Sequence, residues 1–457
     1  MRVSSLGIVV VTFLIAAVVG RVAAFPVNGD QTVLPAGTEL NEDALNTPRE
    51  VFHSETLHGR KSYLINLGDL LFSSPSILGG VARQAGLRCS TCHVNGAGNP
   101  KLYIPKMSTR PGNFDTTGPL FNPKADNQVL DPVRIPSLRG ARLLAPYGID
   151  GRTASLRDFV RNVIVNEFAG PEPSSATVEA IVAYINDIDF LPNPNLGPAG
   201  RLTPVAMESE RRGEALFVKP FPNDPNMSCA TCHVPSGAFV DHRQHDVGSG
   251  GLFKTPTLMN ADYNAPYFHD GRYDTYEQVV AHFDRVFGLG YSDQNRQDLV
   301  DYLNAIGNGM QPYQYEDTPS TLKEVNDFAL VLGAAITAND KDVVALAVDT
   351  IGNELRELTE FYPDRKDTSV SGGENVRALA RQALKEQVLT LRRIDIAVGA
   401  GRLADAATDY EAYRERMVVA VPTLMNNAEQ WSLFTRTVHD AHYAALRQTM
   451  LARRAGQ

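Results

Sequence analysis

Two copies of the pattern Cys-x-x-Cys-His hold all four cysteines of this 457-residue chain. The copies comprise Cys89, Cys92 and His93, and Cys229, Cys232 and His233. On a helix, positions i, i+3 and i+4 share one face, so two thiols and an imidazole can meet one planar group. This spacing is typical of c-type haem attachment, in which both thiols form thioethers and the histidine ligates the iron. The sequence therefore predicts two covalently bound haem c groups.

A single zinc site is the alternative interpretation of the same cysteines. Two Cys-x-x-Cys pairs can supply four thiolates to one tetrahedral zinc ion. That site would leave the histidine after each pair without a role. If both haems are attached instead, no cysteine is left for a disulfide framework.

The first 24 residues have the pattern of a secretory signal peptide. An apolar run extends from Leu6 to Val19, and the small residue Ala24 follows Val22 by two positions. We expect cleavage after Ala24 and a periplasmic protein without a membrane span, although an uncleaved anchor is the alternative. The formal net charge of -9 argues against a nucleic-acid partner.

The chain contains an internal repeat that extends beyond the cysteine motifs. Residues 134–152 align without gaps with residues 254–272 at an offset of 254 − 134 = 120, and nine of the nineteen positions match. Both copies contain Ala-Pro-Tyr and Asp-Gly-Arg triplets. Upstream, "GDLLF" at 68–72 resembles "GEALF" at 213–217. These matches predict two homologous haem domains in tandem.

The predicted fold is all-α, with two cytochrome c-like haem domains and a C-terminal helical bundle. The haem domains cover residues 50–191 and 205–312, and a linker rich in Pro, Gly and Asn joins them. Residues 177–191 and 296–307 have the apolar spacing of amphipathic helices. We expect each of these helices to end its domain and to pack across the haem-bearing helix.

The predicted bundle covers residues 320–457, and its role is packing or docking. A capping box of Thr321 and Glu324 would start its first helix. Two apolar faces are expected, one of Val325, Phe328, Ala329 and Leu332, and one of Val376, Leu379, Ala380, Ala383, Leu384, Val388 and Leu391. A break at "SGG", 371–373, precedes the second face. His439 and His442 are either a metal-binding pair or part of a polar face.

Two haem motifs in tandem, with "PYFHDG" at 266–271, resemble the bacterial di-haem cytochrome c peroxidases. The methylamine-utilisation di-haem oxidases belong to the same superfamily. The resemblance covers roughly residues 60 to 310 and excludes the bundle. It implies a peroxidatic haem on Cys89, Cys92 and His93, and an electron-transfer haem on Cys229, Cys232 and His233. It also implies hydrogen peroxide as substrate, a small cytochrome c or cupredoxin as electron donor, and a candidate calcium ion between the haem domains.

The family carries an acidic residue after the first Asp-Gly-Arg that assists O–O cleavage. Glu167, in "VNEFAG", lies near that place, displaced by about two residues. As a general acid and base it would move a proton between the peroxide oxygens. The alternative is a carboxylate on a helix surface.

The chain departs from the family pattern at two positions. Ile149 stands where the peroxidases often have a tryptophan between the haems, and the one tryptophan of the chain is Trp431. Tyr147 is then the nearest redox-active side chain. The expected sixth ligand of the second haem is replaced by Phe283, so we expect the neighbouring His282 to ligate that iron. If His282 does not ligate, Met259, Met310 or another histidine takes this role.

Several other side chains are candidates around the haems. His269, whose repeat partner is Ile149, is expected to make a haem-linked hydrogen bond, and His242 and His245 are further candidates. Asp150 and Asp270 are expected to stabilise their turns, and Arg152 and Arg272 to pair with propionates. No histidine occurs between His93 and His233, which predicts an open distal site at the first haem, with Met107 as the local residue able to block it.

These patterns favour a periplasmic di-haem peroxidase. One alternative is a di-haem oxidase that modifies Tyr or Trp residues of a partner protein. The other is a non-enzymatic electron carrier with both irons six-coordinate.

Overall fold

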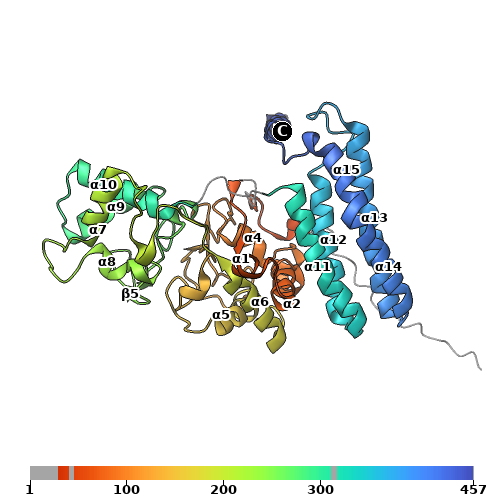
Figure 1. The fold of residues 1–457 in the computed structure, drawn as a ribbon, viewed down its shortest axis with the longest axis horizontal. Helices are drawn as coiled ribbons and strands as arrows, with labels where there is room; N and C mark the ends of the chain where they lie inside the picture. The colour runs from red at the N-terminus through yellow and green to blue at the C-terminus, as the bar shows by residue number, and fades with distance from the viewer. Residues whose placement is uncertain (1–28, 41–45, 310–315, 456–457) are drawn as a thin grey trace, which may run out of the picture.

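The computed structural model describes residues 29–40, 46–309 and 316–455. Among the described residues, helices hold 54% and strands 5%, so the fold is mostly helical, as predicted, with short two-stranded sheets added. The predicted signal peptide lies outside the described residues. Figure 1 shows three groups of elements side by side, with the second haem motif at one end and the C-terminal helices at the other.

The first group surrounds the first haem motif. Its helices are α1 (His53–His58), α2 (Tyr63–Phe72), α3 (Gly80–Gln84), α4 (Cys89–Cys92), α5 (Leu156–Asn162) and α6 (Ser175–Asp187). Antiparallel strands pair β1 (Val51–Phe52) with β4 (Ile188–Asp189), and β2 (Asn113–Phe114) with β3 (Val133–Arg134). A buried apolar core extends through these elements, and Cys89 and Cys92 pack against it.

The second group repeats this order of elements around the second motif. It consists of α7 (Glu208–Val218), α8 (Cys229–Cys232), the pair β5 (Gln244–His245) and β6 (Phe253–Lys254), α9 (Tyr276–Phe287) and α10 (Asp293–Gly307). A separate apolar core lies here, and Cys229 packs against it.

A glycine fixes the same helix crossing in both groups. A Cβ added at Gly68 of α2 would lie 1.9 Å from the carbonyl oxygen of Ala180 in α6. A Cβ at Gly213 of α7 would lie 2.0 Å from the carbonyl oxygen of Asp298 in α10. Only a residue without a side chain permits such close backbone contact. The terminal helix of each group thus packs closely on the helix before the haem motif, which explains why "GDLLF" and "GEALF" share their first residue.

The third group is a helical bundle. Its helices are α11 (Thr318–Ala338), α12 (Lys341–Glu360), α13 (Glu374–Gly399), α14 (Leu403–Glu415), α15 (Val421–Ala428) and α16 (Arg436–Ala455). The predicted face of Val325, Phe328, Ala329 and Leu332 is buried. The prediction of the second apolar face is confirmed except at Leu379. This residue is 51% exposed because it lies on the outer side of α13. The break before α13 is confirmed, since Gly373 caps it in a left-handed conformation.

The predicted start of the first bundle helix was wrong by several residues. Asp317 is the N-cap, and its carboxylate accepts a hydrogen bond from the backbone of Ser320 at 2.8 Å. Thr321 instead donates to Glu316, and Glu324 pairs with Arg49 of the first group. Both Thr321 and Asp317 are good capping residues, so the local pattern alone did not separate them.

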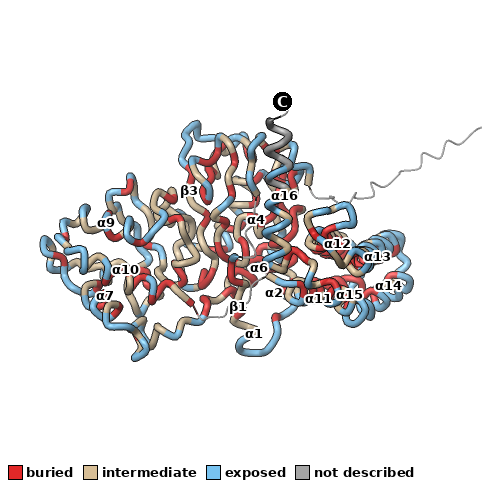
Figure 2. Tube along the Cα trace, turned by 90° about the horizontal axis from the view of Figure 1, so that it is seen from above, coloured by how far each residue is buried: buried red, intermediate tan, exposed pale blue. Residues whose placement is uncertain are grey.

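The bundle is joined to the first group by a shared core and by ion pairs. Leu70 of α2 is fully buried among bundle residues of α11 and α12. Arg88, directly before Cys89, donates to Glu354 of α12 at 2.6 Å and also pairs with Glu357. Figure 2 shows buried residues continuing from α2 into α11 and α12. The bundle therefore packs directly beside the first haem motif.

None of the helices in the described residues combines the length and apolar character that crossing a membrane requires.

Candidate haem sites

The two cysteine motifs adopt the same local structure. In each, a short helix spans the cysteine pair, and the backbone N–H of the histidine donates to the carbonyl of the first cysteine at 2.9 Å. A threonine hydroxyl caps each helix, accepting from the backbone of Arg88 at 3.3 Å and of Ser228 at 2.9 Å. This geometry places both thiols and the imidazole on one side of a tight turn, as attachment of a planar ring requires.

Backbone carbonyls fix both imidazoles through Nδ1. His93 Nδ1 lies 3.0 Å from the carbonyl oxygen of Pro136, and His233 Nδ1 lies 3.1 Å from that of Phe239. Burial lowers the pKa of His93 to about 4 and also lowers that of His233, so both rings are neutral. A neutral imidazole that donates from Nδ1 keeps a lone pair on Nε2 for a metal. Both histidines therefore suit axial ligation of haem iron.

The thiols fit thioether formation better than zinc binding. Burial raises the pKa of Cys89 and of Cys229 to about 12, which disfavours the thiolates that zinc requires. Cys89 and Cys92 also pack against one apolar core, whereas Cys229 packs against another. The structure therefore does not bring them together in one tetrahedral zinc site.

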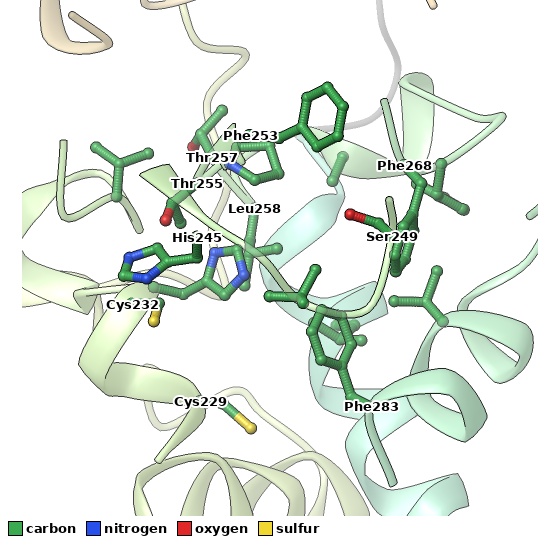
Figure 3. A pocket seen from close by; sticks show the side chains of 18 of the residues that line it. Cys229, Cys232, His245, Ser249, Phe253, Thr255, Thr257, Leu258, Phe268 and Phe283 are labelled. Atoms are coloured by element: carbon green, nitrogen blue, oxygen red, sulfur yellow. The ribbon is translucent and has the colours of Figure 1, made fainter. Parts of the chain in front are cut away.

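A cavity of about 280 Å³ opens at the second motif. Cys229, Cys232 and His233 line it, and its other walls are mainly apolar and aromatic. Figure 3 shows both cysteine sulfurs facing this space, with Phe268 and Phe283 across from them. An apolar space that carries two thiols and one neutral imidazole fits a covalently bound haem.

Residues of the first group complete the wall of this cavity. Arg134, Leu144 and Ile149 line it together with residues of the second group. The contact between groups is reciprocal, because Arg134 N donates to the carbonyl of His269 at 2.7 Å and Lys254 N to that of Ile149 at 3.1 Å. Arg134 and Lys254 are repeat partners, as are Ile149 and His269. Equivalent backbone hydrogen bonds therefore join the two copies of the repeat.

Glu167 lies at the end of a π-helical turn, η6 (Val163–Glu167). Its carboxylate, 11% exposed, accepts a hydrogen bond from Arg152 at 2.7 Å. Burial raises the pKa of Glu167, while the nearby guanidinium opposes that shift. Single π-helical turns are frequent at functional sites. The buried position differs from that of a simple surface carboxylate, and the role of Glu167 in catalysis stays a prediction.

His282 is buried, and both its ring nitrogens have protein partners. Nε2 lies 2.8 Å from the carbonyl of Val247, and Nδ1 lies 3.0 Å from the hydroxyl of Tyr273. Phe283, not His282, lines the cavity. Ligation by His282 stays a prediction, and it would require loss of the bond to Val247 or to Tyr273.

Three other predicted histidines lie near the second motif. His245 and His269 line the cavity, and the His269 ring stacks on Phe253 with centroids 3.7 Å apart. His245 Nε2 pairs with Asp241 at 2.6 Å. His242 instead bonds the carbonyl of Ala145 at 2.7 Å, across the contact between the two groups.

The two Asp-Gly-Arg turns are closed by their own residues. Asp150 accepts from the backbone N–H of Arg152 at 3.3 Å, and Asp270 from that of Arg272 at 3.1 Å. Each arginine side chain also pairs with the aspartate of its turn. The aspartates thus stabilise the turns, and pairing of the arginines with propionates stays a prediction.

The methionines, Tyr147 and Trp431 that the sequence singled out lie in different parts of the molecule. Met107 is buried in the first core, and Met259 packs beside the second. Tyr147 donates to the carbonyl of Ala141 at 3.3 Å. Met310 lies outside the described residues. Trp431 packs over Gly373 in the bundle.

In the bundle, the two predicted metal-binding histidines pair with different aspartates. His439 bonds Asp440 at 3.1 Å, and His442 bonds Asp367 at 2.7 Å. Metal binding by the two histidines together stays a prediction.

A small cavity of about 10 Å³ lies between the two groups. Asn99, Pro100, Asn264 and Pro266 line it, and the buried side-chain oxygen of Asn264 has no hydrogen-bond partner. Oxygen ligands suit calcium, and Arg134 also lines this cavity. Calcium binding here stays a prediction.

Two structural features were not predicted from the sequence. One is the pairing of Arg88 with Glu354 and Glu357, which joins segments far apart in the chain. The other is a hydrogen bond from Tyr276 to Asp262 at the second cavity. The repeat contained a signal for the second, because Arg142 and Leu156 occupy the equivalent positions.

Comparison with known proteins places the second motif in a described family. The model of the family "Di-haem cytochrome c peroxidase" matches residues 208–312. Hydrazine synthase subunit gamma of Kuenenia stuttgartiensis is 26% identical over 230 residues, covering 37% of this chain and 63% of that protein. A solved structure of hydrazine synthase from the same organism gives a TM-score of 0.40 at 21% identity, covering 58% of this chain and 92% of that chain.

Two further relatives are a cytochrome-c peroxidase and a MauG protein. Cytochrome-c peroxidase IdrP1 of Pseudomonas sp. (strain SCT) is 30% identical, covering 19% of this chain and 27% of that protein. Methylamine utilization protein MauG of Methylorubrum extorquens is 32% identical, covering 24% of this chain and 30% of that protein. The chain spans less than two thirds of the length of each of these curated relatives. On these matches, residues 208–312 fit the di-haem cytochrome c peroxidase family, and parts of the chain are similar to cytochrome-c peroxidases and to MauG.

Proposed function

We propose that this protein is a periplasmic di-haem c-type peroxidase that reduces hydrogen peroxide with electrons from a small redox protein. The match of residues 208–312 to the family and the similarity to cytochrome-c peroxidases support this proposal. The observation that carries it is the shared geometry of the two motifs, in which His93 and His233 are neutral and anchored through Nδ1. When bound, the haems supply the redox chemistry of peroxide reduction.

The chain supplies binding and proton transfer. Cys89 and Cys92 hold the peroxidatic group, and Cys229 and Cys232 hold the electron-transfer group. Glu167 moves a proton between the two peroxide oxygens. Arg152 orients the carboxylate and limits the rise of its pKa, so that Glu167 can both give and accept a proton. The buried setting of Glu167 keeps this proton away from bulk water.

Electrons enter at the second motif in this proposal. Thr91 and Thr231 occupy the same position in their motifs, yet Thr91 is 4% exposed and Thr231 is exposed to solvent. Arg88 and the bundle restrict access to the first motif. A cytochrome c or cupredoxin can therefore approach the second motif more closely, and electron transfer weakens steeply with distance.

The domain plan of the proposal is two tandem haem domains, residues 50–191 and 205–312, followed by the bundle at 320–457. The repeated order of elements, the paired glycines Gly68 and Gly213, and the separate apolar cores support it. A signal peptide at 1–24 would deliver the chain to the periplasm. A calcium ion between the haem domains belongs to the same proposal.

Haem content and peroxide turnover test the proposal together. The mature protein should hold two haems by pyridine haemochrome, and Cys89→Ala combined with Cys92→Ala should leave one. With reduced cytochrome c as donor, the wild type should consume two electrons per peroxide, and the double variant should lose this activity. Fewer than two haems, or full turnover by the double variant, would contradict the assignment.

A subunit of a larger enzyme is the second candidate function. The similarity to hydrazine synthase subunit gamma, over 230 residues, favours it. Stable co-purification with other haem proteins, without peroxide turnover by the isolated chain, would support this candidate. An oxidase that modifies a partner's Tyr or Trp residues would instead leave an oxidised aromatic residue on the co-purified protein.

A further inference from the structure

A buried tyrosine hydroxyl is bonded to a carboxylate beside the second haem cavity. Tyr276, the first residue of α9, is 7% exposed and donates to Asp262 Oδ1 at 2.7 Å. The ring of Tyr267 stacks on that of Tyr276, with centroids 4.8 Å apart and planes at 22°.

Both tyrosines line the cavity that carries Cys229 and His233. Helix α10 leaves room for the bond between Tyr276 and Asp262. A Cβ added at Gly307 would lie 2.5 Å from Asp262 Oδ1 and 2.5 Å from the Tyr276 hydroxyl oxygen. The hydrogen bond thus depends on a glycine packed directly against it.

The fold does not require this arrangement, because the first copy of the repeat lacks it. At the offset of 120, Asp262 corresponds to Arg142 (262 − 120) and Tyr276 to Leu156 (276 − 120). Both copies start the following helix at this position, after Ser155 or Thr275 as N-cap. Tyr267 corresponds to Tyr147. The carboxylate and the second tyrosine therefore belong to the second site alone.

The arrangement meets the chemical requirement for one-electron oxidation of a phenol. A tyrosine that loses an electron becomes strongly acidic and must release its proton to a nearby base. Burial raises the pKa of Asp262 to about 6, so its carboxylate is ionised at neutral pH and can accept that proton. Asp262, Arg134 and Glu277 are the charged groups that act on the neighbouring Tyr267.

Tyr147 does not meet this requirement. Its hydroxyl donates to the carbonyl of Ala141, which is not a base, at 3.3 Å. The ammonium of Lys254 lies 5.9 Å from the centre of its ring. A positive charge at this distance opposes loss of an electron from the ring.

We propose that Tyr276 is a redox-active tyrosine that stores one oxidising equivalent beside the second haem. In this step Tyr276 would give its phenolic proton to Asp262 and one electron to the group that Cys229, Cys232 and His233 would hold, with hydrogen peroxide as the source of the oxidising equivalent. The products would be a neutral tyrosyl radical on Tyr276 and a carboxylic acid on Asp262, with the oxidising equivalent moved from that group to the tyrosine. Return of one electron and of the proton from Asp262 restores the starting state. This step rests on the proposed function for its natural oxidant.

Photochemical oxidation tests the tyrosine without peroxide. The holoprotein is illuminated with ruthenium(II) tris(bipyridine) and hexaammineruthenium(III) as quencher, then frozen for EPR. The wild type should give a tyrosyl radical, confirmed by the narrowing of its signal with ring-deuterated tyrosine. Tyr276→Phe should lower the yield at least tenfold, and Asp262→Asn should lower it to a similar extent. Tyr147→Phe is the matched control and should leave the yield unchanged.

The outcomes separate this inference from the proposed function. A tyrosyl signal that persists in Tyr276→Phe, that disappears in Tyr147→Phe, or that is absent from the wild type would overturn the inference. Asp262→Asn keeps the ring and replaces only the base, so it decides the question even if Tyr276→Phe loses its second haem. A photochemical radical on Tyr276 in a protein that does not reduce peroxide would contradict the proposed function and leave the redox-active tyrosine standing.

Discussion

The carboxylate of Glu167 and the guanidinium of Arg152 are joined by a hydrogen bond of 2.7 Å in the first haem-motif group. Arg152 ends the first Asp-Gly-Arg triplet, and Glu167 ends the π-helical turn that follows α5. A buried carboxylate is costly unless a charged partner stabilises it. The pair therefore keeps a titratable group in a largely buried position.

Replacement of this acid should affect peroxide chemistry alone. Glu167→Gln keeps the shape but cannot transfer a proton, so we expect the rate with peroxide to fall by about 10²- to 10⁴-fold. Cyanide affinity should stay nearly unchanged, because cyanide binding needs no O–O cleavage. Stopped-flow absorbance measures both reactions. Glu172→Gln is the control, since Glu172 also pairs with an arginine but is 59% exposed. Equal rates for the two variants would exclude Glu167 as the acid.

The contact between the bundle and the first motif should contribute to stability. Arg88→Met removes a buried guanidinium that pairs with Glu354, 16% exposed, and with the more exposed Glu357. We expect a loss of about 2 to 4 kcal/mol in the free energy of unfolding. Chemical denaturation followed by circular dichroism gives this value. Arg416→Met removes an exposed pair with Glu386 and should cost less than about 1 kcal/mol. Similar losses for both variants would show that the contact adds no special stability.

The helix crossing in the second group should not tolerate a methyl group. Gly213→Ala places a Cβ 2.0 Å from the carbonyl oxygen of Asp298, so α7 and α10 must separate. We expect the free energy of unfolding to fall by about 1 to 3 kcal/mol. We also expect a smaller fraction of the molecules to carry the second haem. Haem stain and thermal unfolding measure the two effects. Gly399→Ala, where the Cβ meets nothing within 4 Å, should be neutral. A stable Gly213→Ala protein with two haems would contradict the predicted close contact.

A buried carboxyl in the bundle should make stability depend on pH. Burial raises the pKa of Asp349 to about 6, and one of its oxygens has no hydrogen-bond partner. Between the ordinary value of 3.8 and about 6, the folded state binds more protons than the unfolded state, so stability falls as pH rises through this window. Asp349→Asn should therefore gain about 1 to 3 kcal/mol at pH 7 and almost nothing near pH 4.

Denaturation at several pH values measures this difference. Glu411→Gln, an exposed carboxylate of α14, is the control and should show no such trend. A gain for Asp349→Asn that is equal at both pH values would contradict the raised pKa.

Local patterns predicted the elements of the fold well. The spacing of Val325, Phe328 and Leu332 predicted a buried helix face because helix periodicity is a local property. The start of α11 was misplaced because two capping residues, Asp317 and Thr321, compete within one turn. Leu379 was assigned to a buried face because the spacing does not show how far the apolar stripe extends around a helix.

Long-range contacts were not predictable from one sequence. Arg88 and Glu354 are far apart in the chain, and no local pattern signals their pairing. The contact of Arg134 with His269, and of Lys254 with Ile149, uses backbone groups, which leave no trace in residue type. The site at Tyr276 could have been predicted from the sequence. Comparison of the two repeat copies shows that only the second copy has a tyrosine at this position and a carboxylate at position 262.

The EPR spectrum of the fully oxidised protein tests the peroxidase assignment most directly. No histidine occurs between His93 and His233, so the first haem should have an open sixth position. The account predicts one high-spin and one low-spin ferric haem, with the high-spin signal converting to low-spin on addition of cyanide. It also predicts loss of the high-spin signal in the variant with Cys89→Ala and Cys92→Ala. A spectrum that is wholly low-spin, and unchanged by cyanide or peroxide, would contradict the assignment and identify the protein as an electron carrier.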